Sequence, residues 1–363
     1  MSIKKRTFVL NIIKELGNIK GEMFLQKLLY FLSYYKVGEI YYHYDKNHYG
    51  PYSYELKGDL NYFENEGFID INSVNRTHYI IPNEQKINEF LIDNQKDLKN
   101  GNRDYLIRVK ILDIFNNDLR TLDRIELFST MHILVVHDKI ILKEQVFKAV
   151  ENWKPERFTL EDKKKIWKIL IGYKMIPETV IEVNDSIEKL NNITTGHKDA
   201  YKYHRFIEKI LKKLFEDQLT NFRIEDPINW GRKRIDFDAK NNSKSGFFSE
   251  IRKYHNIKCP FIMFESKNIS HDLKTPHYDQ MIGRFSFDRG YFGIITCRKI
   301  ENKVKLLKQL RDIYNKNSID KYIVLVIDDN DIKEMLILKE RGLRPDEVLE
   351  LKLKELIFNC TRR

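Results

Sequence analysis

The chain has 363 residues, of which 42% are hydrophobic and 12% aromatic, and this length and composition predict two or three compact domains. No apolar run is long enough to cross a bilayer, the N-terminus lacks the pattern of a secretory signal peptide, and three cysteines form no metal-ligand or disulfide framework. These features exclude a membrane protein and favour a cytoplasmic one.

The formal net charge is +11, and it is unevenly spread. From Gly196 onward there are 35 Lys and Arg against 25 Asp and Glu, so this part alone carries +10. A bias toward lysine along the whole chain would not produce that asymmetry. The basic C-terminal part is therefore expected to bind nucleic acid.

Residues 1–85 have the pattern of three helices and a β-hairpin. The second helix, Glu22–Tyr35, places its apolar residues on one face, and Ser53 opens a third helix that Gly67 ends. Two strand-like runs follow, Phe68–Ile71 and Thr77–Ile81. This order predicts a winged helix, a fold that places one helix in the major groove of DNA.

The third helix would then contact DNA, and the hairpin would form the wing. The side chains expected at nucleic acid are Ser53, Tyr54, Lys57 and Asn61 on the helix and Arg76 on the hairpin. The same helix also carries four acidic residues, Glu55, Asp59, Glu64 and Glu66. They oppose contact with phosphates, so a protein partner is almost as well supported. Tyrosines between Tyr41 and Tyr54 could stack on bases, although packing in the core is favoured.

Residues 86–195 are predicted to be a mostly helical connector. Thr159 suits the N-cap of one helix and Pro155 the end of another. The polar stretch Asn184–Gly196 has the composition of a linker. The sequence leaves open whether this region is a second winged helix, a dimerisation element or a spacer.

Residues 196–363 alternate between helical and strand-like patterns. The helix Asp199–Phe215 is amphipathic, and apolar runs with helical stretches between them follow it, at Ile235–Phe237, Phe261–Phe264, Phe292–Thr296 and Tyr322–Ile327. The whole chain is thus predicted to be a multidomain α/β protein, with a winged helix, a helical middle and a C-terminal mixed sheet flanked by helices.

Three charged residues stand at the ends of two of these strands. Asp236 lies in the first, and Glu265 and Lys267 end the next, where positions i and i+2 face the same side. Phosphodiester hydrolysis needs a metal ion, and Mg²⁺ keeps several waters, so one or two carboxylates suffice to hold it. A Glu-x-Lys pair alone is more typical of a solvated strand end with an incidental ion pair. Its combination with Asp236 favours a nuclease.

The segments KYHRFIEKILKKLF, GRKRIDFD, FESKN, YDQMIGRF and FGIITCR together resemble the PD-(D/E)XK superfamily of restriction-endonuclease-like nucleases. The resemblance implies that Asp236 and Glu265 bind Mg²⁺, or alternatively Mn²⁺, and that Lys267 positions the attacking water. It also implies catalytic roles for Glu208, which otherwise suits a surface pair with Lys212, and for Gln280. The sequence departs from the family pattern by having isoleucine before Asp236 and a long excursion before Glu265.

Basic residues around these motifs are candidates for contacts with the nucleic-acid backbone. They are Arg232, Lys233 and Arg284, the last of which suits a surface salt bridge equally well. In the first domain, LQKLLYFLSYY followed by HYGPYSYELKGDL resembles the phage-associated Panacea or SocA-like winged-helix module. Members of that family often bind proteins, which keeps a protein partner open.

The expected function is a Mg²⁺-dependent endonuclease in bacterial restriction or anti-phage defence, with DNA favoured over RNA. A homodimer is plausible because such enzymes often cut both strands. Two alternatives remain: a non-catalytic DNA-binding regulator or antitoxin-like binding protein, and a structure-selective repair nuclease.

Overall fold

The computed structural model describes residues 3–39, 41–74, 77–94, 102–228, 233–316 and 321–361. It is a mixed α/β structure with two compact units, Met1–Ile181 and Glu182–Arg363. None of the helices within those ranges is both long and apolar enough to cross a membrane.

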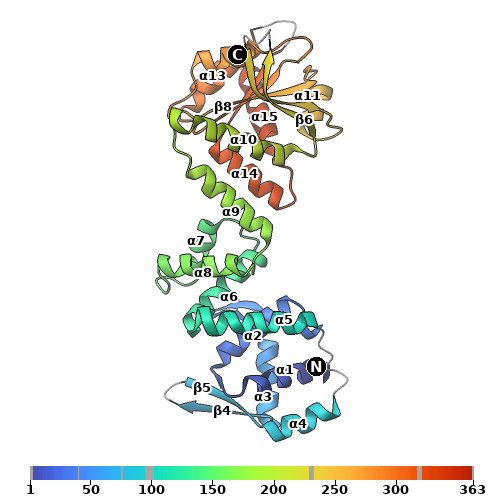
Figure 1. Cartoon of the computed structure of the whole chain (residues 1–363), viewed down its shortest axis with the longest axis vertical. Helices are drawn as coiled ribbons and strands as arrows, with labels where there is room; N and C mark the ends of the chain where they lie inside the picture. The colour runs from blue at the N-terminus through green and yellow to red at the C-terminus, as the bar shows by residue number, and fades with distance from the viewer. Residues whose placement is uncertain are drawn as a thin grey trace. The chain divides into compact units, whose positions relative to one another are not determined.

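The first unit is mainly helical, and it contains a small antiparallel sheet in the order β1-β5-β4. Figure 1 shows β4 and β5 of this sheet beside α3. Its elements are α1 (Ile3–Leu16), β1 (Ile19–Lys20), α2 (Glu22–Tyr34), η1 (Val37–Glu39), β2 (Asp45–Asn47), β3 (Gly50–Tyr52), α3 (Tyr54–Asn65), β4 (Ile69–Val74), β5 (Thr77–Pro82), α4 (Glu84–Asp93), α5 (Asn102–Asp113), the π-helical η3 (Ile114–Leu119), α6 (Leu122–Val136), α7 (Lys143–Trp153) and α8 (Leu160–Gly172).

Several helix ends lie where the sequence predicts them. The Ser53 hydroxyl accepts a hydrogen bond from the Leu56 amide at the start of α3, and Gly67 follows this helix with a φ of 65°. Thr159 and Asp162 form a capping box at the start of α8. These caps satisfy backbone groups that a helix end leaves without partners.

One hydrophobic core runs through the first unit. Its buried residues extend from Phe8 to Val180, and the Phe31 ring of α2 packs against Phe115 and Phe128, with ring centroids 5.9 and 5.1 Å apart. The boundary expected after residue 85 therefore does not separate two compact units, because the helices on both sides of it share buried side chains.

Two polar residues of α2 are buried and hold the loop that precedes α3. The Gln26 side-chain amide exchanges two hydrogen bonds with the backbone of Ser53, and Lys27 Nζ donates to the Pro51 carbonyl at 2.6 Å. A Cβ on Gly50 would lie only 2.8 Å from Thr130 Oγ1, so this loop also needs a glycine. The Gln-Lys and Gly-Pro-Tyr-Ser motifs thus stabilise one another.

Burial lowers the pKa of Lys27 from its ordinary 10.5 to about 7, and the nearby Glu126 only partly opposes this shift. Between these two values the unfolded chain holds a proton that the folded chain has released. The free energy of unfolding should therefore rise with pH in this window because of Lys27, by up to about 1.4 kcal/mol per pH unit.

Lys27→Met should remove this contribution, so that its urea-unfolding free energy rises less steeply than that of the parent between pH 7 and 10. Fluorescence of Trp153 and Trp167 follows the first unit. Equal slopes in the two proteins would show that Lys27 titrates normally in the fold.

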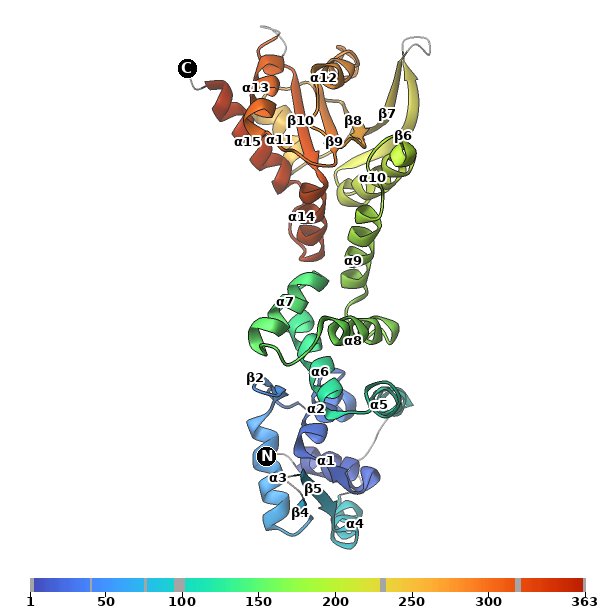
Figure 2. The same cartoon turned by 90° about the vertical axis from the view of Figure 1, so that its left-hand side faces the viewer.

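The second unit contains a five-stranded mixed sheet in the order β10-β9-β8-β7-β6 (Figure 2). Strands β8, β9 and β10 are parallel, and β6 and β7 are antiparallel to their neighbours. The elements are α9 (Glu178–Asn191), which carries the boundary between the units, η4 (His197–Asp199), α10 (Ala200–Phe215), β6 (Leu219–Ile228), β7 (Lys233–Asn241), α11 (Phe247–Tyr254), β8 (Phe261–Lys267), α12 (Thr275–Ile282), β9 (Phe292–Cys297), α13 (Lys303–Tyr314), β10 (Ile323–Asp328), α14 (Asp329–Glu340) and α15 (Glu347–Thr361).

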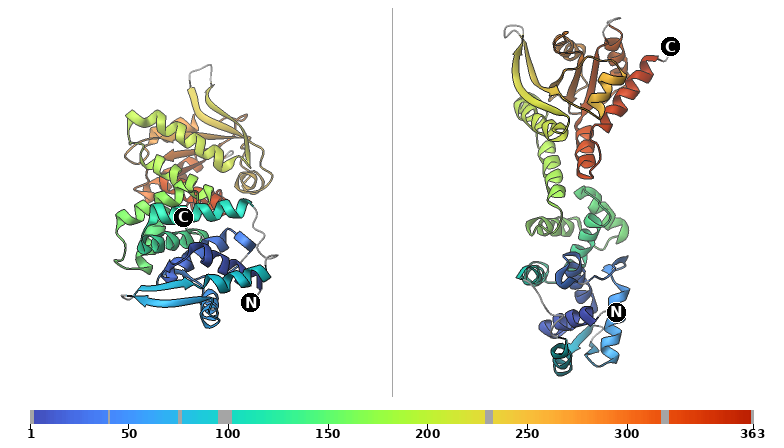
Figure 3. Two further views of the ribbon diagram at one scale, coloured as in Figure 1. Left: turned by 60° about the horizontal axis from the view of Figure 1, so that its bottom comes forward. Right: turned by 90° about the vertical axis from the view of Figure 1, so that its right-hand side faces the viewer.

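Helices pack against this sheet and bury its central strands. Strands β9 and β10 are buried along their whole length, α10 packs against β8, and α13 packs against β10 and α15. A Cβ on Gly293 of β9 would lie 2.4 Å from the Met281 sulfur, so this glycine lets α12 approach closely. Strands β6 and β7 continue beyond the other strands as a two-stranded ribbon (Figure 3).

Two expectations for this region are wrong. The polar stretch Asn184–Gly196 is helical as far as Asn191, because Val183, Ile187 and Leu190 recur at helical spacing and are buried despite their polar neighbours. The strand β6 was not expected, since its sequence contains a proline and several charges. It is an edge strand, a position that tolerates both.

Candidate active site

The sheet brings Asp236 and Glu265 face to face. Strand β7 pairs with β8 so that Phe237 lies opposite Phe264, and their rings stack with centroids 4.5 Å apart. Asp236 and Glu265 are the next residues of the two strands, and the Ser266 amide, one residue beyond Glu265, donates to Asp236 Oδ2 at 2.9 Å. Opposed residues of an antiparallel pair project from the same face, so the two carboxylates converge although 28 residues separate them in the chain.

Lys267 and two groups from the region of α12 complete the cluster. Lys267 Nζ donates to Glu265 Oε1 and, at 2.8 Å, to Gln280 Oε1. Arg284, just after α12, forms an ion pair with the other oxygen of Glu265. Glu265 and Arg284 are almost completely buried, with side-chain exposures of 1% and 2%. The predicted carboxylate, lysine and glutamine are thus brought together.

The two carboxylates differ in their electrostatic environment. Burial and the charge of Asp236 raise the pKa of Glu265, and Arg284 and Lys267 only partly oppose this. Burial alone would also raise the pKa of Asp236, but the His204 side chain and the Ser266 amide, which donates at 2.9 Å, outweigh it and lower that pKa. Asp236 is therefore the stronger acid of the pair.

Helix α10 contributes His204 and Glu208, one turn apart on the same face. His204 Nδ1 lies 3.4 Å from Asp236 Oδ2. Burial would lower the pKa of His204, but the hydrogen bond and charge of Asp236, with a further contribution from Glu208, raise it. Glu208 pairs with Arg205 at 3.2 Å rather than with Lys212. Glu208 thus lies close enough to His204 to affect its pKa, but its own ion pair is with Arg205.

His204 and the buried role of Arg284 are the parts of this cluster that sequence reasoning missed. His204 precedes Glu208 by four residues, which places both on one face of a helix, and this spacing was the available signal. Arg284 was expected at the surface, either against a phosphate or in a surface salt bridge. It is instead an internal counter-ion for Glu265, because a buried carboxylate requires a charged partner.

The residues predicted to contact nucleic acid at the start of α3 and along it differ in their exposure. Ser53 is fully buried as a helix cap, and Lys57 is paired with Glu22 at 2.7 Å. Tyr54 and Asn61 are exposed, and the Tyr54 hydroxyl accepts a hydrogen bond from Asn47. Asp59 is buried and accepts from Tyr42, so it does not belong to the exposed face of α3.

Three further predicted contacts lie at the edges of what the structure describes. Arg76 and Arg232 fall outside the described residues, and Lys233 is described only as the first backbone position of β7.

The donor set suits a hard divalent cation held by few protein ligands. Asp236 uses Oδ2 for Ser266 and His204, and among the described residues Oδ1 has no partner. Both Glu265 oxygens contact cations. The described residues contain no group of three or more His, Cys, Asp or Glu side chains arranged around a common metal position. Two opposed carboxylates fit Mg²⁺, which retains several waters, provided that Glu265 exchanges one cationic partner for the metal.

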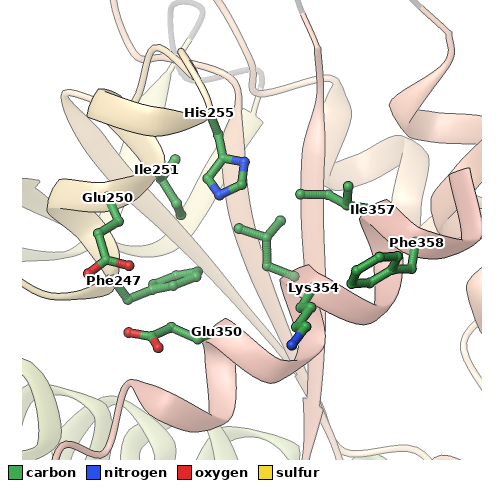
Figure 4. A pocket seen from close by; sticks show the side chains of 9 residues that line it. Phe247, Glu250, Ile251, His255, Glu350, Lys354, Ile357 and Phe358 are labelled. Carbon is green, nitrogen blue, oxygen red and sulfur yellow. The ribbon is translucent and has the colours of Figure 1, made fainter. Parts of the chain in front are cut away.

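A cavity of about 320 Å³ in the same unit lies elsewhere, between α11 and α15 (Figure 4). Phe247, Ile251 and Phe358 give it an apolar floor, and Glu250 and Glu350 lie at its side. It contains none of the residues of the carboxylate cluster. The cavity and the carboxylate cluster are therefore two separate places in the second unit.

Compared with known proteins, the sequence matches no protein-family model and no curated protein at a significant level.

Proposed function

We propose that the chain is a Mg²⁺-dependent endonuclease that hydrolyses DNA phosphodiester bonds, with Asp236, Glu265 and Lys267 as its catalytic residues. The observation that carries this proposal is the register of β7 and β8, which opposes the two carboxylates and places Lys267 two residues beyond one of them. Such a set is what metal-assisted phosphodiester hydrolysis requires.

In this proposal Asp236 and Glu265 hold the metal, which when bound supplies Lewis-acid activation of water and neutralises charge on the phosphate. Lys267 is half-buried and positioned by Gln280, so its ammonium group can orient the attacking water and stabilise the phosphate oxygens. Gln280 acts as a positioning residue for Lys267. Glu208 acts through His204, which holds Asp236 by its imidazole.

The wider architecture supports a nuclease of the restriction-endonuclease-like type joined to a winged helix. The order α1, β1, α2, α3, β4, β5 of the first unit is that of winged helices, and a mixed sheet flanked by helices carries the carboxylates. Glu55 and Glu64 of α3 and Glu66 just after it are all exposed, although Glu55 is paired with Lys5. These acidic residues do not favour docking of α3 against DNA phosphates, so a protein contact is the better proposal for it.

A second function has one observation in its favour. Both oxygens of Glu265 are paired with cations, Lys267 and Arg284, so the carboxylate has partners without a metal ion. In that case the cluster is structural, and the chain is a DNA-binding regulator or an antitoxin-like protein without catalysis.

A cleavage assay separates the two functions. Supercoiled plasmid, single-stranded DNA and branched DNA are incubated with the full chain and Mg²⁺ or Mn²⁺, and EDTA should abolish cutting. Lys267→Ala should cut at least about 100-fold more slowly, because it removes a charge that is aimed at the phosphate. Lys240→Ala, which alters an exposed lysine of the same β7 strand, should cut like the parent.

No cutting of any of these substrates, with or without cell extract, would reject the nuclease. Equal cutting by Lys267→Ala and the parent would leave a nuclease but reject this site. Preference for branched over plasmid DNA would favour a repair enzyme over a restriction enzyme.

A further inference from the structure

Helix α12 places a line of polar side chains along the carboxylate cluster. His277, Gln280 and Arg284 follow one another at intervals of three and four residues, a spacing that puts them on one face. Gln280 accepts a hydrogen bond from Lys267, and Arg284 pairs with Glu265. His277 comes about one helical turn before Gln280, so it lies beside Lys267 and further from Arg284.

The His277 ring is held in one orientation and one tautomer. Its Nδ1 accepts a hydrogen bond from the backbone amide of Lys274 at 2.9 Å, and a nitrogen that accepts carries no proton. In the neutral ring the proton is therefore on Nε2. This Nε2 has no partner among the residues that the structure describes, and it is open to solvent, unlike the enclosed Nε2 atoms of His132 and His204. His277 thus presents a hydrogen-bond donor that the fold itself does not use.

Positive charge gathers around this donor. Burial lowers the pKa of His277, and the charges of Lys267, His271 and Lys274 lower it further, so the ring is neutral at pH 7. His271 and Lys274 are exposed and form no ion pair with any described residue. The carboxylate of Asp272, which lies between them in the chain, accepts instead from two backbone amides just before α13. A donor among cations selects an anion with oxygen acceptors.

A DNA strand supplies such an anion next to the phosphate that is cut. Each strand of the duplex carries one phosphate per about 3.4 Å of helix axis. His277 lies about 4.5 Å further along α12 than Gln280, which holds Lys267, because a helix rises about 1.5 Å per residue. With the scissile phosphate at Lys267, the phosphate beside it is within reach of His277 and Lys274.

We propose that His277 Nε2 and the Lys274 ammonium group bind the phosphate that neighbours the scissile one. They position the strand and take no part in hydrolysis. This assignment rests on the proposed function, because that function places the scissile phosphate at Lys267. The group that is recognised is a phosphate, so a free phosphate ion is the competing source of the same chemistry.

Fluorescence anisotropy of the full chain with a labelled duplex and a labelled single strand tests the assignment, in EDTA or Ca²⁺ and over a salt series. Lys274→Ala should weaken binding and lower the slope of log K against log salt by about 0.9 for the duplex or about 0.7 for the single strand, because one phosphate contact is lost. His277→Ala should weaken binding about 2- to 10-fold with the slope unchanged, because a neutral ring releases no counterion. His277→Gln keeps a side-chain donor and should recover part of the affinity.

The kinetics of plasmid cleavage provide an independent readout. Lys274→Ala and His277→Ala should raise KM about 3- to 10-fold and leave kcat within about twofold, because a flanking phosphate is held equally in the ground state and the transition state. His255→Ala and Lys240→Ala are matched controls and should behave like the parent. Both residues are exposed and lie toward the start of β8, whose other end carries Lys267: His255 ends α11, and Lys240 pairs with the first residue of β8.

Failure of this contact and failure of the hydrolysis are distinguishable. If the variants weaken binding as expected but the parent cuts nothing, the phosphate contact stands and the hydrolysis fails. If the parent cuts and both alanine variants keep its affinity and KM, the hydrolysis stands and the contact is overturned.

Two further outcomes would overturn the assignment. Calorimetric binding of inorganic phosphate that both variants lose, without binding of DNA, would identify a free anion, and binding of neither would leave no phosphate ligand at all. Lys274→Ala keeps the backbone amide that holds His277, so it should melt like the parent. A loss of affinity accompanied by a lower thermal midpoint in both alanine variants would give these residues a purely structural role.

Discussion

Asp236→Asn is expected to lower the rate of DNA cleavage by about 10²- to 10³-fold or more while it leaves the fold intact. A metal ion supplies several kcal/mol of transition-state stabilisation, and about 1.4 kcal/mol corresponds to a tenfold change in rate. Asparagine keeps an oxygen that can accept from the Ser266 amide, so the local structure is retained. The substitution also removes the negative charge of Asp236, which raises the pKa of Glu265.

Asp238, two residues along the same strand, provides a matched control. It is more buried than Asp236, with 2% of its side chain exposed against 23%, and both of its oxygens accept from Arg223, at 3.0 and 3.1 Å. Asp238→Asn should therefore lower the free energy of unfolding by about 1–3 kcal/mol and leave cleavage nearly unchanged. Plasmid cleavage rates and chemical denaturation of both variants measure the two effects. If Asp238→Asn abolishes cleavage and Asp236→Asn does not, the metal ligand has been assigned to the wrong aspartate.

Arg284→Met is expected to destabilise the second unit by about 3–5 kcal/mol. Glu265 is buried between Arg284 and Lys267, and removing the arginine leaves a buried carboxylate with one counter-ion fewer. The double variant Glu265→Leu with Arg284→Met removes both charges, so it should recover most of this loss. Denaturation followed by circular dichroism provides the free energies.

An exposed ion pair provides the control for the stability loss expected in Arg284→Met. Lys303 pairs with Glu355, and the two side chains are 65% and 35% exposed, so Lys303→Met should cost no more than about 1 kcal/mol. If Arg284→Met costs no more than Lys303→Met, or if the double variant is less stable than both single variants, Arg284 is not the counter-ion that Glu265 requires.

The central strands of the second unit and the charges on them could be predicted because both have strong local signals. Apolar runs such as Phe292–Thr296 are typical of buried strands, and Glu265 and Lys267 follow one of these runs at a spacing that places them on one side. Asp236 was predicted to join them if the two strands formed an antiparallel hairpin with Asn241–Ile257 as the excursion between them. That it lies opposite Glu265 follows from the register, which depends on pairing across the sheet and is not written in either strand alone.

The remaining misses have a common cause. Ser53, Arg284 and Asp59 were read as surface residues because polar side chains usually are exposed. Two of the side chains have a partner that is distant in sequence, since Arg284 donates to Glu265 and Asp59 accepts from Tyr42, while Ser53 is buried because its backbone is bonded to the Gln26 side chain. Such partnerships depend on tertiary packing, so a pattern of polar and apolar residues cannot reveal them.

The shared core of the first unit has a consequence for how this protein could arise by exchange of gene segments. A break after residue 85 would separate Phe31 from Phe115 and Phe128 and expose their faces to water, at a cost of several kcal/mol for aromatic side chains of this size. A break within α9 would leave both cores whole. The smallest segment that could be exchanged with this core whole is therefore residues 1–181.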